Sequence, residues 1–319
     1  MLALLWAFLF LSGLMLISIE SWVWWTLLAA FMQAVRTAGQ KYLSSEVSAL
    51  ATTLVRYLYG LPFAGIWLYL LHRHLNLDLP DLNLTFLWSG FVAGMLQIVA
   101  TVLLIRLFSL RNFAVGTTYA KSEVLLTAVI GFVFFTERIT FISGGAMIIC
   151  VLGLIVISIA KSDGLEGLWS RSAAYGLGAG LCFSLTSLFL RQASLSLEVL
   201  ERSEGASMLT ASMTLMYMVF LQSVITTIFV VKTQPGELQR VFRAWRPALF
   251  VGFTGVVGSI GWFTAMTLEM ASYVKTLGQI EFVFTMLIAV FYFRERPSSK
   301  EWLGMLMILC GGLLILWRF

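Results

Sequence analysis

Two glutamates, each followed by a long apolar stretch, are the residues of this sequence best suited to chemistry. Glu123 is followed four residues later by Thr127, and Glu281 by Thr285, in otherwise apolar surroundings. A carboxylate is costly within a bilayer, so one placed there usually serves transport or proton transfer. Burial favours the uncharged form of a carboxyl group. We therefore expect at least one of the two glutamates to act in coupling or gating. The structural alternative is that each one caps a helix or pairs within the bundle.

Basic and amide side chains in other apolar stretches could bind a polar solute. Arg36, Arg56, Lys121 and Lys275 lie within apolar stretches, as the two glutamates do. Four positive charges are thus set against two negative charges, which leaves an excess of positive charge. Unpaired charge is costly in a medium of low dielectric constant, and an anionic group on a substrate would neutralise it. We expect a carboxylate- or phosphate-bearing substrate, anionic or zwitterionic, held chiefly by Lys121 and Arg36. The predicted substrate-binding residues are Arg36, Gln40, Arg56, Gln97, Lys121, Trp262, Lys275 and Gln279, with Gln40 and Gln279 setting the orientation.

Several of these residues have structural interpretations as well. Lys275 could extend to the lipid headgroups, Arg56 could pair with a glutamate, and Trp262 could simply pack. At about 100° per residue, Lys121 and Glu123 would point to nearly opposite sides of one helix. One helix face is then expected to line a cavity and the other to pack against neighbouring helices.

The composition indicates a membrane protein that crosses the bilayer many times. Hydrophobic residues make up 60% of the 319 residues and charged residues 12%, which is far from a soluble domain. The net charge of +5 is explained by Lys and Arg at membrane-flanking loops, so no nucleic-acid partner is expected. Apolar segments of about 20 residues can span a bilayer as helices. The predicted core helices cover residues 22–43, 50–72, 85–107, 113–135, 140–160, 173–194, 207–231, 247–268, 271–293 and 299–317.

The second half of the chain repeats the first. Each matched residue of the second copy lies 158 positions after its counterpart, as Glu281 does after Glu123 and Gly252 after Gly94. Five helices is an odd number, so the two copies must run through the membrane in opposite directions. We predict an all-α polytopic fold of ten core transmembrane helices, arranged as two inverted five-helix repeats. The predicted divisions are residues 1–20 as a hydrophobic leader or extra N-terminal helix, 21–160 as the first repeat and 161–319 as the second.

The doubled motif resembles that of the EamA family of the drug/metabolite transporter superfamily. In that family a Glu-Pro-Val near a helix start is followed 14 residues later by Glu-Arg, as Glu123 is by Glu137-Arg138 and Glu281 by Glu295-Arg296. The resemblance covers residues 22 to 317. It implies ten helices around a central cavity, alternating access and a small organic substrate. The usual proline is Val124 in one copy and Phe282 in the other, so we expect a straighter helix there. The two Glu-Arg pairs are expected to be interfacial anchors.

An enzyme is disfavoured. The three aspartates lie in loops, both histidines share one loop, and the sequence contains neither a Walker A motif nor a dinucleotide-binding glycine pattern. The three cysteines are far apart. We expect no cofactor and no metal site.

We therefore predict a secondary transporter of a small organic metabolite that works by alternating access through a central cavity. The alternatives are a flippase for a lipid-linked or lipid-like substrate, a drug or amino-acid exporter and, less well supported, a non-transporting membrane subunit. The resemblance and the compact loops favour the bacterial cytoplasmic (inner) membrane. The expected partners are the lipid bilayer and the substrate, and the protein is expected to be a monomer or a homodimer.

The membrane orientation can be predicted from the charges. Loops after the first, third, fifth, seventh and ninth core helices hold most of the Lys and Arg residues near helix ends. The positive-inside rule places these loops in the cytoplasm and the C-terminus outside. The family usually has both termini in the cytoplasm, so the two predictions conflict, and we favour the charges. An additional N-terminal helix formed by residues 1–18 would reconcile this bias with a cytoplasmic N-terminus.

Overall fold

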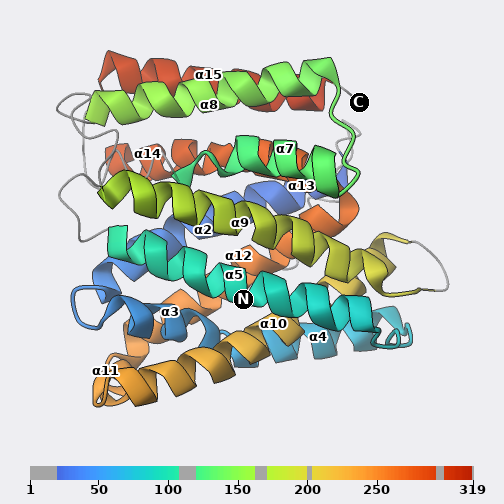
Figure 1. Cartoon of the computed structure of the whole chain (residues 1–319), viewed down its shortest axis with the longest axis vertical. Coiled ribbons are helices and arrows are strands. Elements are labelled where there is room, and N and C mark those ends of the chain that lie inside the picture. Colours follow the sequence, from blue (N-terminus) through green and yellow to red (C-terminus); the bar gives the residue numbers. More distant parts are fainter. Residues whose placement is uncertain (1–19, 108–119, 162–170, 200–202, 292–297, 318–319) are drawn as a thin grey trace.

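A computed structural model describes residues 20–107, 120–161, 171–199, 203–291 and 298–317, and every regular element in these ranges is helical (Figure 1). The all-α membrane class is confirmed. Six helices of at least 18 residues are apolar enough to cross a bilayer, when Ala49–Leu75 is taken as one, and two shorter apolar helices accompany them. These numbers do not establish the predicted count of ten transmembrane helices.

The helices are α2 (Ser21–Leu43), α3 (Ala49–Leu58), α4 (Leu61–Leu75), α5 (Leu84–Leu107), α7 (Glu123–Phe134), α8 (Phe141–Lys161), α9 (Arg171–Ser196), α10 (Glu204–Thr233), α11 (Glu237–Arg243), α12 (Trp245–Leu268), α13 (Ala271–Leu277), the 3₁₀ helix η1 (Gly278–Ile280), α14 (Glu281–Phe291) and α15 (Ser299–Leu316).

Equivalent helices of the two copies run antiparallel. Adding the offset of 158 to the α3–α4 segment gives the position of α10, and adding it to α8 gives that of α15. Ser48, just before α3, donates a hydrogen bond to Gln234, just after α10. Leu75, at the end of α4, lies beside Gly205, near the start of α10. The start of one helix therefore meets the end of its counterpart, as inverted repeats require.

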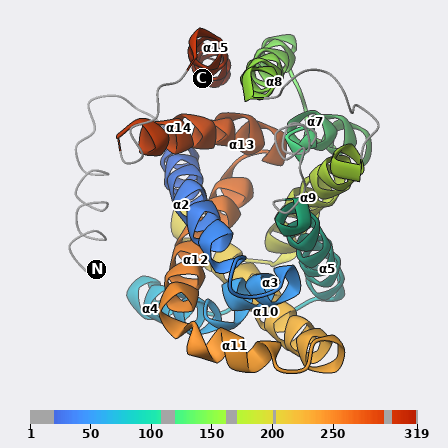
Figure 2. The same cartoon turned by 90° about the vertical axis from the view of Figure 1, so that its left-hand side faces the viewer.

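The two copies interleave rather than stand side by side. The first long helix of each copy packs along the third helix of the other, α2 against α12 and α9 against α5, while α8 packs against α15. The end-on view in Figure 2 shows α2 and α12 on one side and α5 and α9 on the other. In the α8–α15 pair, a Cβ on Gly153 would lie 2.6 Å from the carbonyl oxygen of Gly304. Such contact is possible only because neither position has a side chain.

Three predicted helices, 50–72, 113–135 and 271–293, are interrupted within the described residues. The 50–72 prediction is corrected to α3 and α4, because Pro62 follows the junction at Tyr59–Gly60 and cannot donate the helical hydrogen bond there. The 271–293 prediction is corrected to α13, η1 and α14. The expectation of a straighter helix beside Phe282 is therefore wrong, since a 3₁₀ turn precedes Glu281 without any proline. In the first copy Lys121 and Ser122 form a turn and α7 begins at Glu123.

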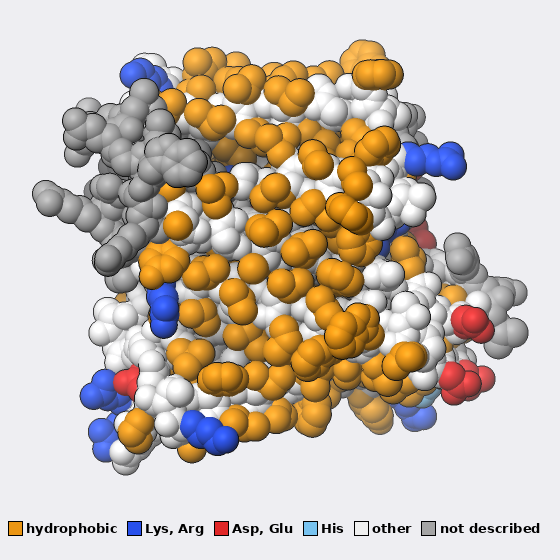
Figure 3. Space-filling view, in the orientation of Figure 1, with side chains coloured by type: hydrophobic (Ala, Val, Ile, Leu, Met, Phe, Trp, Pro, Cys, Tyr) orange, Lys and Arg blue, Asp and Glu red, His pale blue; other side chains and the backbone are white. Residues whose placement is uncertain are grey.

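The surface is apolar between two charged edges. Figure 3 shows hydrophobic side chains across the described face, with Lys and Arg mainly along one edge and most Asp and Glu along the other. The edge where α2 ends and α15 begins carries the exposed residues Lys41, Arg106, Lys232, Arg240, Arg243, Arg246 and Lys300. The cytoplasmic location of this edge stays a prediction. Residues 1–18, predicted as an extra helix, and the Glu295-Arg296 pair lie outside the described residues.

Candidate substrate and coupling site

Each of the two deep glutamates pairs with a lysine of the other repeat. Lys121 Nζ lies 3.3 Å from a carboxylate oxygen of Glu281, and Lys275 Nζ lies 3.5 Å from one of Glu123. The interpretation that Lys121 and Glu123 face away from each other along one helix is corrected, because Lys121 belongs to a turn and the rule of 100° per residue does not apply. The alternative that Lys275 extends to the headgroups is also wrong, since Lys275 is only 9% exposed. Thr127 and Thr285 donate to the backbone carbonyls of the glutamates.

Trp262 on α12 joins the two ion pairs. Its indole N–H donates to Gln33 Oε1 at 3.0 Å, and Gln33 Nε2 donates to Glu281 at 3.0 Å. Lys275 Nζ lies over the face of the same indole ring, 5.2 Å from its centroid, in a cation–π contact. The ring also lies against Gly278 of the 3₁₀ turn, where an added Cβ would be 2.3 Å from it. Trp262 is therefore part of the ion-pair network. Its Gln33 partner was a neutral polar residue in the sequence with no predicted role.

Two arginines are buried without a carboxylate partner. Arg36 on α2 is 5% exposed and Arg56 on α3 is 6% exposed, and neither forms an ion pair with any described residue. Arg56 Nη1 donates to Thr101 Oγ1 at 3.3 Å, and its guanidinium group lies 5.4 Å from the Tyr57 ring. Arg36 Nε is buried with no hydrogen-bond partner in the described structure. The alternative that Arg56 pairs with a glutamate is wrong for the described residues.

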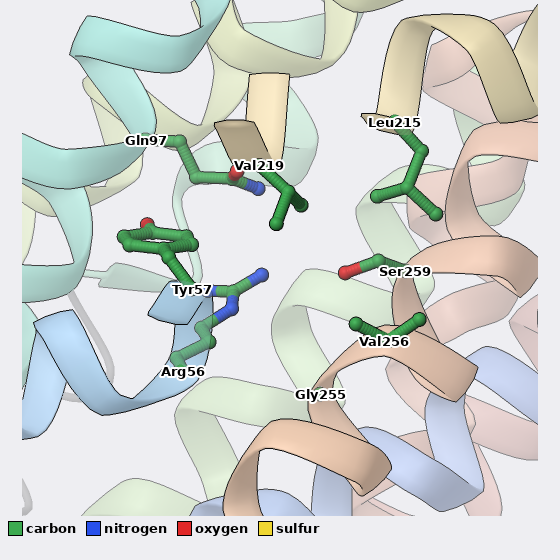
Figure 4. Close-up of a pocket in the computed structure, with 8 residues that line it drawn as sticks. All are labelled: Arg56, Tyr57, Gln97, Leu215, Val219, Gly255, Val256 and Ser259. Carbon is green, nitrogen blue, oxygen red and sulfur yellow. The ribbon is translucent and has the colours of Figure 1, made fainter. Parts of the chain in front are cut away.

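A small cavity adjoins Arg56 (Figure 4). Its volume is about 10 Å³, which is about what one water molecule requires. In Figure 4 the guanidinium group of Arg56 points toward the space between Gln97, Val219 and Ser259. Gln97 accepts a hydrogen bond from Gln222 Nε2 at 2.8 Å through its amide oxygen, which leaves its amide nitrogen as a donor. The lining residues are Arg56, Tyr57, Gln97, Leu215, Val219, Gly255, Val256 and Ser259.

The two arginine side chains meet beside one glycine of α12. An added Cβ at Gly255 would lie 3.4 Å from Arg56 Cγ and 3.5 Å from Arg36 Cδ. Arg36 also lies within electrostatic range of both Arg56 and Glu281, and Lys121 within range of Arg36, Glu281 and Glu123. These charges form a connected row, with the two arginines at one end and the Lys275–Glu123 pair at the other. The row consists of Arg56, Arg36, Glu281, Lys121, Glu123 and Lys275.

The structure separates the predicted substrate residues into groups. Arg56 and Gln97 line the cavity, and Arg36 adjoins Arg56. Lys121, Lys275 and Trp262 belong to the ion-pair network. Gln279 donates to the carbonyl of Lys275 at 2.9 Å, within the broken helix, and the amide nitrogen of Gln40 is buried without a described partner. Neither amide lines the cavity. Ser259, Tyr57 and Thr101 were not predicted, because hydroxyl groups are common in helices that cross membranes.

The Glu137-Arg138 prediction also needs correction. Glu137 is 5% exposed rather than interfacial, and its carboxylate accepts hydrogen bonds from the backbone N–H groups of Ala271 at 2.7 Å and Ser272 at 3.2 Å. These N–H groups open α13, where a helix lacks internal acceptors and favours negative charge. Tyr273 adds a hydrogen bond from its hydroxyl group to the carbonyl of Arg138 at 2.8 Å. The Glu-Arg motif of the first repeat therefore fixes the broken helix of the second.

A comparison with family models identifies the family to which the chain belongs. The model of the EamA-like transporter family matches residues 20–159 and again residues 170–317. The chain belongs to the EamA-like transporter family. EamA family members are membrane transporters rather than enzymes, and the two matches agree with the duplication. The fold has a solved relative, described only as "Crystal structure of protein", with a TM-score of 0.69 and 14% identity over 93% of this chain and 98% of that one. No curated protein matches the sequence.

Proposed function

We propose that this EamA-family protein is a secondary transporter that moves a small organic anion by alternating access between its two inverted repeats. The observation that carries the sign of the substrate is the Arg36–Arg56 pair, which is buried and has no carboxylate partner among the described residues. The two lysines cannot fill this role, because each already has a glutamate. The sequence assigned the anion chiefly to Lys121 and Arg36, and the proposed site keeps Arg36 and replaces Lys121 with Arg56.

The two ion pairs supply the link to conformational change. Each joins the repeats near the interrupted segments, since Lys121 precedes α7 and Glu281 opens α14. Discontinuous helices with charged groups at the break are typical of transporter binding sites at the bilayer midplane. Because each pair links one copy to the other, rearrangement of one copy against the other changes both. We assign Glu281 as the first candidate for coupling, because its carboxylate is the one within electrostatic range of Arg36.

A flippase for a lipid-like molecule is the second candidate, and one observation favours it. An apolar groove of about 260 Å³ lies between α14 and α15, lined by Val283, Met286, Leu287, Val290, Phe291, Trp302, Met305, Leu306 and Leu309. Several of these side chains are exposed, so an acyl chain could reach the groove from the bilayer. A bacterial cytoplasmic membrane remains our proposed location, supported by the compact loops and the family.

Counterflow in proteoliposomes tests the transport proposal. Anionic, cationic and neutral metabolites are offered to vesicles that contain wild type, Arg36→Met, Arg56→Met or the control Arg73→Met, which removes an exposed arginine. We expect anions to be exchanged by wild type and the control, and exchange to fall at least about tenfold in the two buried variants. Exchange of cations that both buried variants retain would refute the anion proposal. Transbilayer movement of a labelled lipid without solute exchange would favour the flippase.

A further inference from the structure

We propose that the Arg36–Arg56 site selects a doubly charged anionic group, of the kind carried by a phosphate monoester, over a singly charged one. The inference rests on the proposed function, since it names the substrate class of the same site. It comes from three features of the described structure: the charge surplus of the row, the donors around the cavity and the glycine between the arginines.

The charge surplus of the row is two. At one end Lys275 and Glu123 neutralise each other at 3.5 Å. At the other end Lys121 contacts the carboxylate of Glu281, Arg36 lies within electrostatic range of it, and Arg56 lies beside Arg36 with no carboxylate partner. A monoanion bound there would leave one positive charge uncompensated in a medium of low dielectric constant, whereas a dianion would compensate both. The row of charges therefore matches two negative charges better than one.

The groups around the cavity are donors. Arg36 does not line the cavity but adjoins Arg56, and its Nε has no partner among the described residues. Gln97 lines the cavity, and in the described structure only its amide oxygen is bonded, accepting from Gln222. Most helical Ser and Thr hydroxyl groups here donate to the carbonyl four residues earlier, as Thr267 and Thr276 do. Ser259 shows no such bond in the described structure and turns its hydroxyl group toward Arg56 (Figure 4). Guanidinium, amide and hydroxyl donors around one point suit the several oxygens of a phosphoryl group.

Space for this group depends on Gly255. The cavity is water-sized in this conformation, so a phosphoryl group enters only when the repeats move apart. A single Cβ at Gly255 would already be in van der Waals contact with both arginine side chains. A large side chain at this position would fill the space between the guanidinium groups. Gly255→Leu is therefore a steric test of the site that leaves its charge unchanged.

The test uses two ligands of nearly equal shape and different charge. Phenyl phosphate carries close to two negative charges at pH 8, since the second pKa of a phosphate monoester is about 6, and phenyl sulfate carries one. Methyl phosphate and methyl sulfate form a smaller pair. Binding is measured by calorimetry on the full chain in phosphatidylcholine nanodiscs. We expect each phosphate ester to bind wild type and the exposed control Arg73→Gln at least about tenfold more tightly than its sulfate partner.

The variants make the result specific. Arg36→Gln removes one of the two surplus charges and should bring the phosphate and sulfate esters to within about threefold of each other. Gly255→Leu should weaken both esters together. Size-exclusion profiles and melting temperatures establish that each variant is folded. Wild type that binds the two esters equally, or prefers the sulfate, overturns the dianion inference but leaves an anion transporter. Failure to bind any ester overturns the inference, and if cations are also transported, the proposed function fails with it.

One further arm distinguishes the source of the phosphate group. Nanodiscs that contain phosphatidic acid present the same monoester chemistry as a lipid headgroup. Unchanged binding of phenyl phosphate in these nanodiscs indicates a soluble ester as the ligand. Competition by phosphatidic acid assigns the dianion site to a lipid and supports the flippase alternative.

Discussion

Replacing Glu281 with Gln should destabilise the bundle, because Lys121 of the other repeat would lose the carboxylate that it contacts at 3.3 Å. The two side chains are only 12% and 16% exposed, so solvent screens the pair poorly. Removal of one partner from a buried pair costs about 3–5 kcal/mol. We take about 3 kcal/mol, because the new amide can still accept from Gln33. At roughly 2–4 °C per kcal/mol, the melting temperature in nanodiscs should fall by about 6–12 °C.

The pairing itself is tested by a double-mutant cycle. Lys121→Met should lower the melting temperature by a similar amount, and the double variant Lys121→Met/Glu281→Gln should fall by much less than the sum, since both members of the pair are then removed together. The control cycle combines Lys121→Met with Glu123→Gln, a pair two residues apart in sequence whose salt bridges go to other partners. The ion pairs across the repeats would be contradicted by two results together. The decreases in melting temperature would be additive in the Lys121/Glu281 cycle and strongly coupled in the Lys121/Glu123 cycle.

Four other outcomes follow from the described contacts. Alkaline phosphatase fused after Phe319 should be active and a fluorescent protein there dark, and the opposite pattern would place the C-terminus in the cytoplasm. Glu137→Gln should lower stability by about 0.5–2 kcal/mol in thermal melts, because two N–H groups of α13 lose a charged acceptor; an unchanged melt would contradict the cap. Gly278→Ala should cost about 1–3 kcal/mol by clashing with Trp262, whereas the control Gly145→Ala, which has nothing within 4 Å, should not. Glu281→Gln should tighten the binding of an anion in calorimetry, because a negative charge beside Lys121 and Arg36 is removed; unchanged binding would contradict this.

The duplication was predictable because the same residue types recur in the second half of the sequence at a constant offset of 158 positions. Glu123 and Glu281, with their threonines four residues on, identify equivalent helices without any structural information. An odd number of helices per copy then requires inversion. The apolar lengths located most helices to within a few residues. These conclusions depend only on hydrophobicity and chain length, which act through the bilayer and not through particular contacts.

The broken helix was not predictable from its own residues. The stretch from Ala271 to Phe291 contains no proline, and its one glycine, Gly278, is a residue that transmembrane helices often contain. Its 3₁₀ turn lies where the Trp262 ring presses against Gly278, and Trp262 belongs to another helix. The contact between Trp262 and Gly278, which belong to different helices, therefore determines the position of the 3₁₀ turn. The pattern of hydrophobic residues along the sequence does not predict this contact.

The ion pairs were predictable in part. Helical spacing alone led to the wrong conclusion, because it compared Lys121 with its neighbour Glu123 rather than with a residue 160 positions away. The repeat offered a better guide, since the lysines occupy positions one turn apart in equivalent helices while the glutamates coincide. Inverted copies that meet at their interrupted segments bring the lysine of one to the glutamate of the other. The arginines became the proposed anion site only once these pairs had been assigned.

The effect of Glu281 on the affinity for an anion follows from its position in the row of charges. Glu281→Gln removes the negative charge that faces Lys121 and Arg36, so the site becomes more positive and should bind a sulfate ester, whose own charge is fixed, more tightly than wild type does. Glu123→Gln serves as the control, because Glu123 pairs with Lys275 at the far end of the row. Tighter binding of the sulfate ester by the Glu123 variant, with unchanged binding by the Glu281 variant, would transfer the proposed role to Glu123.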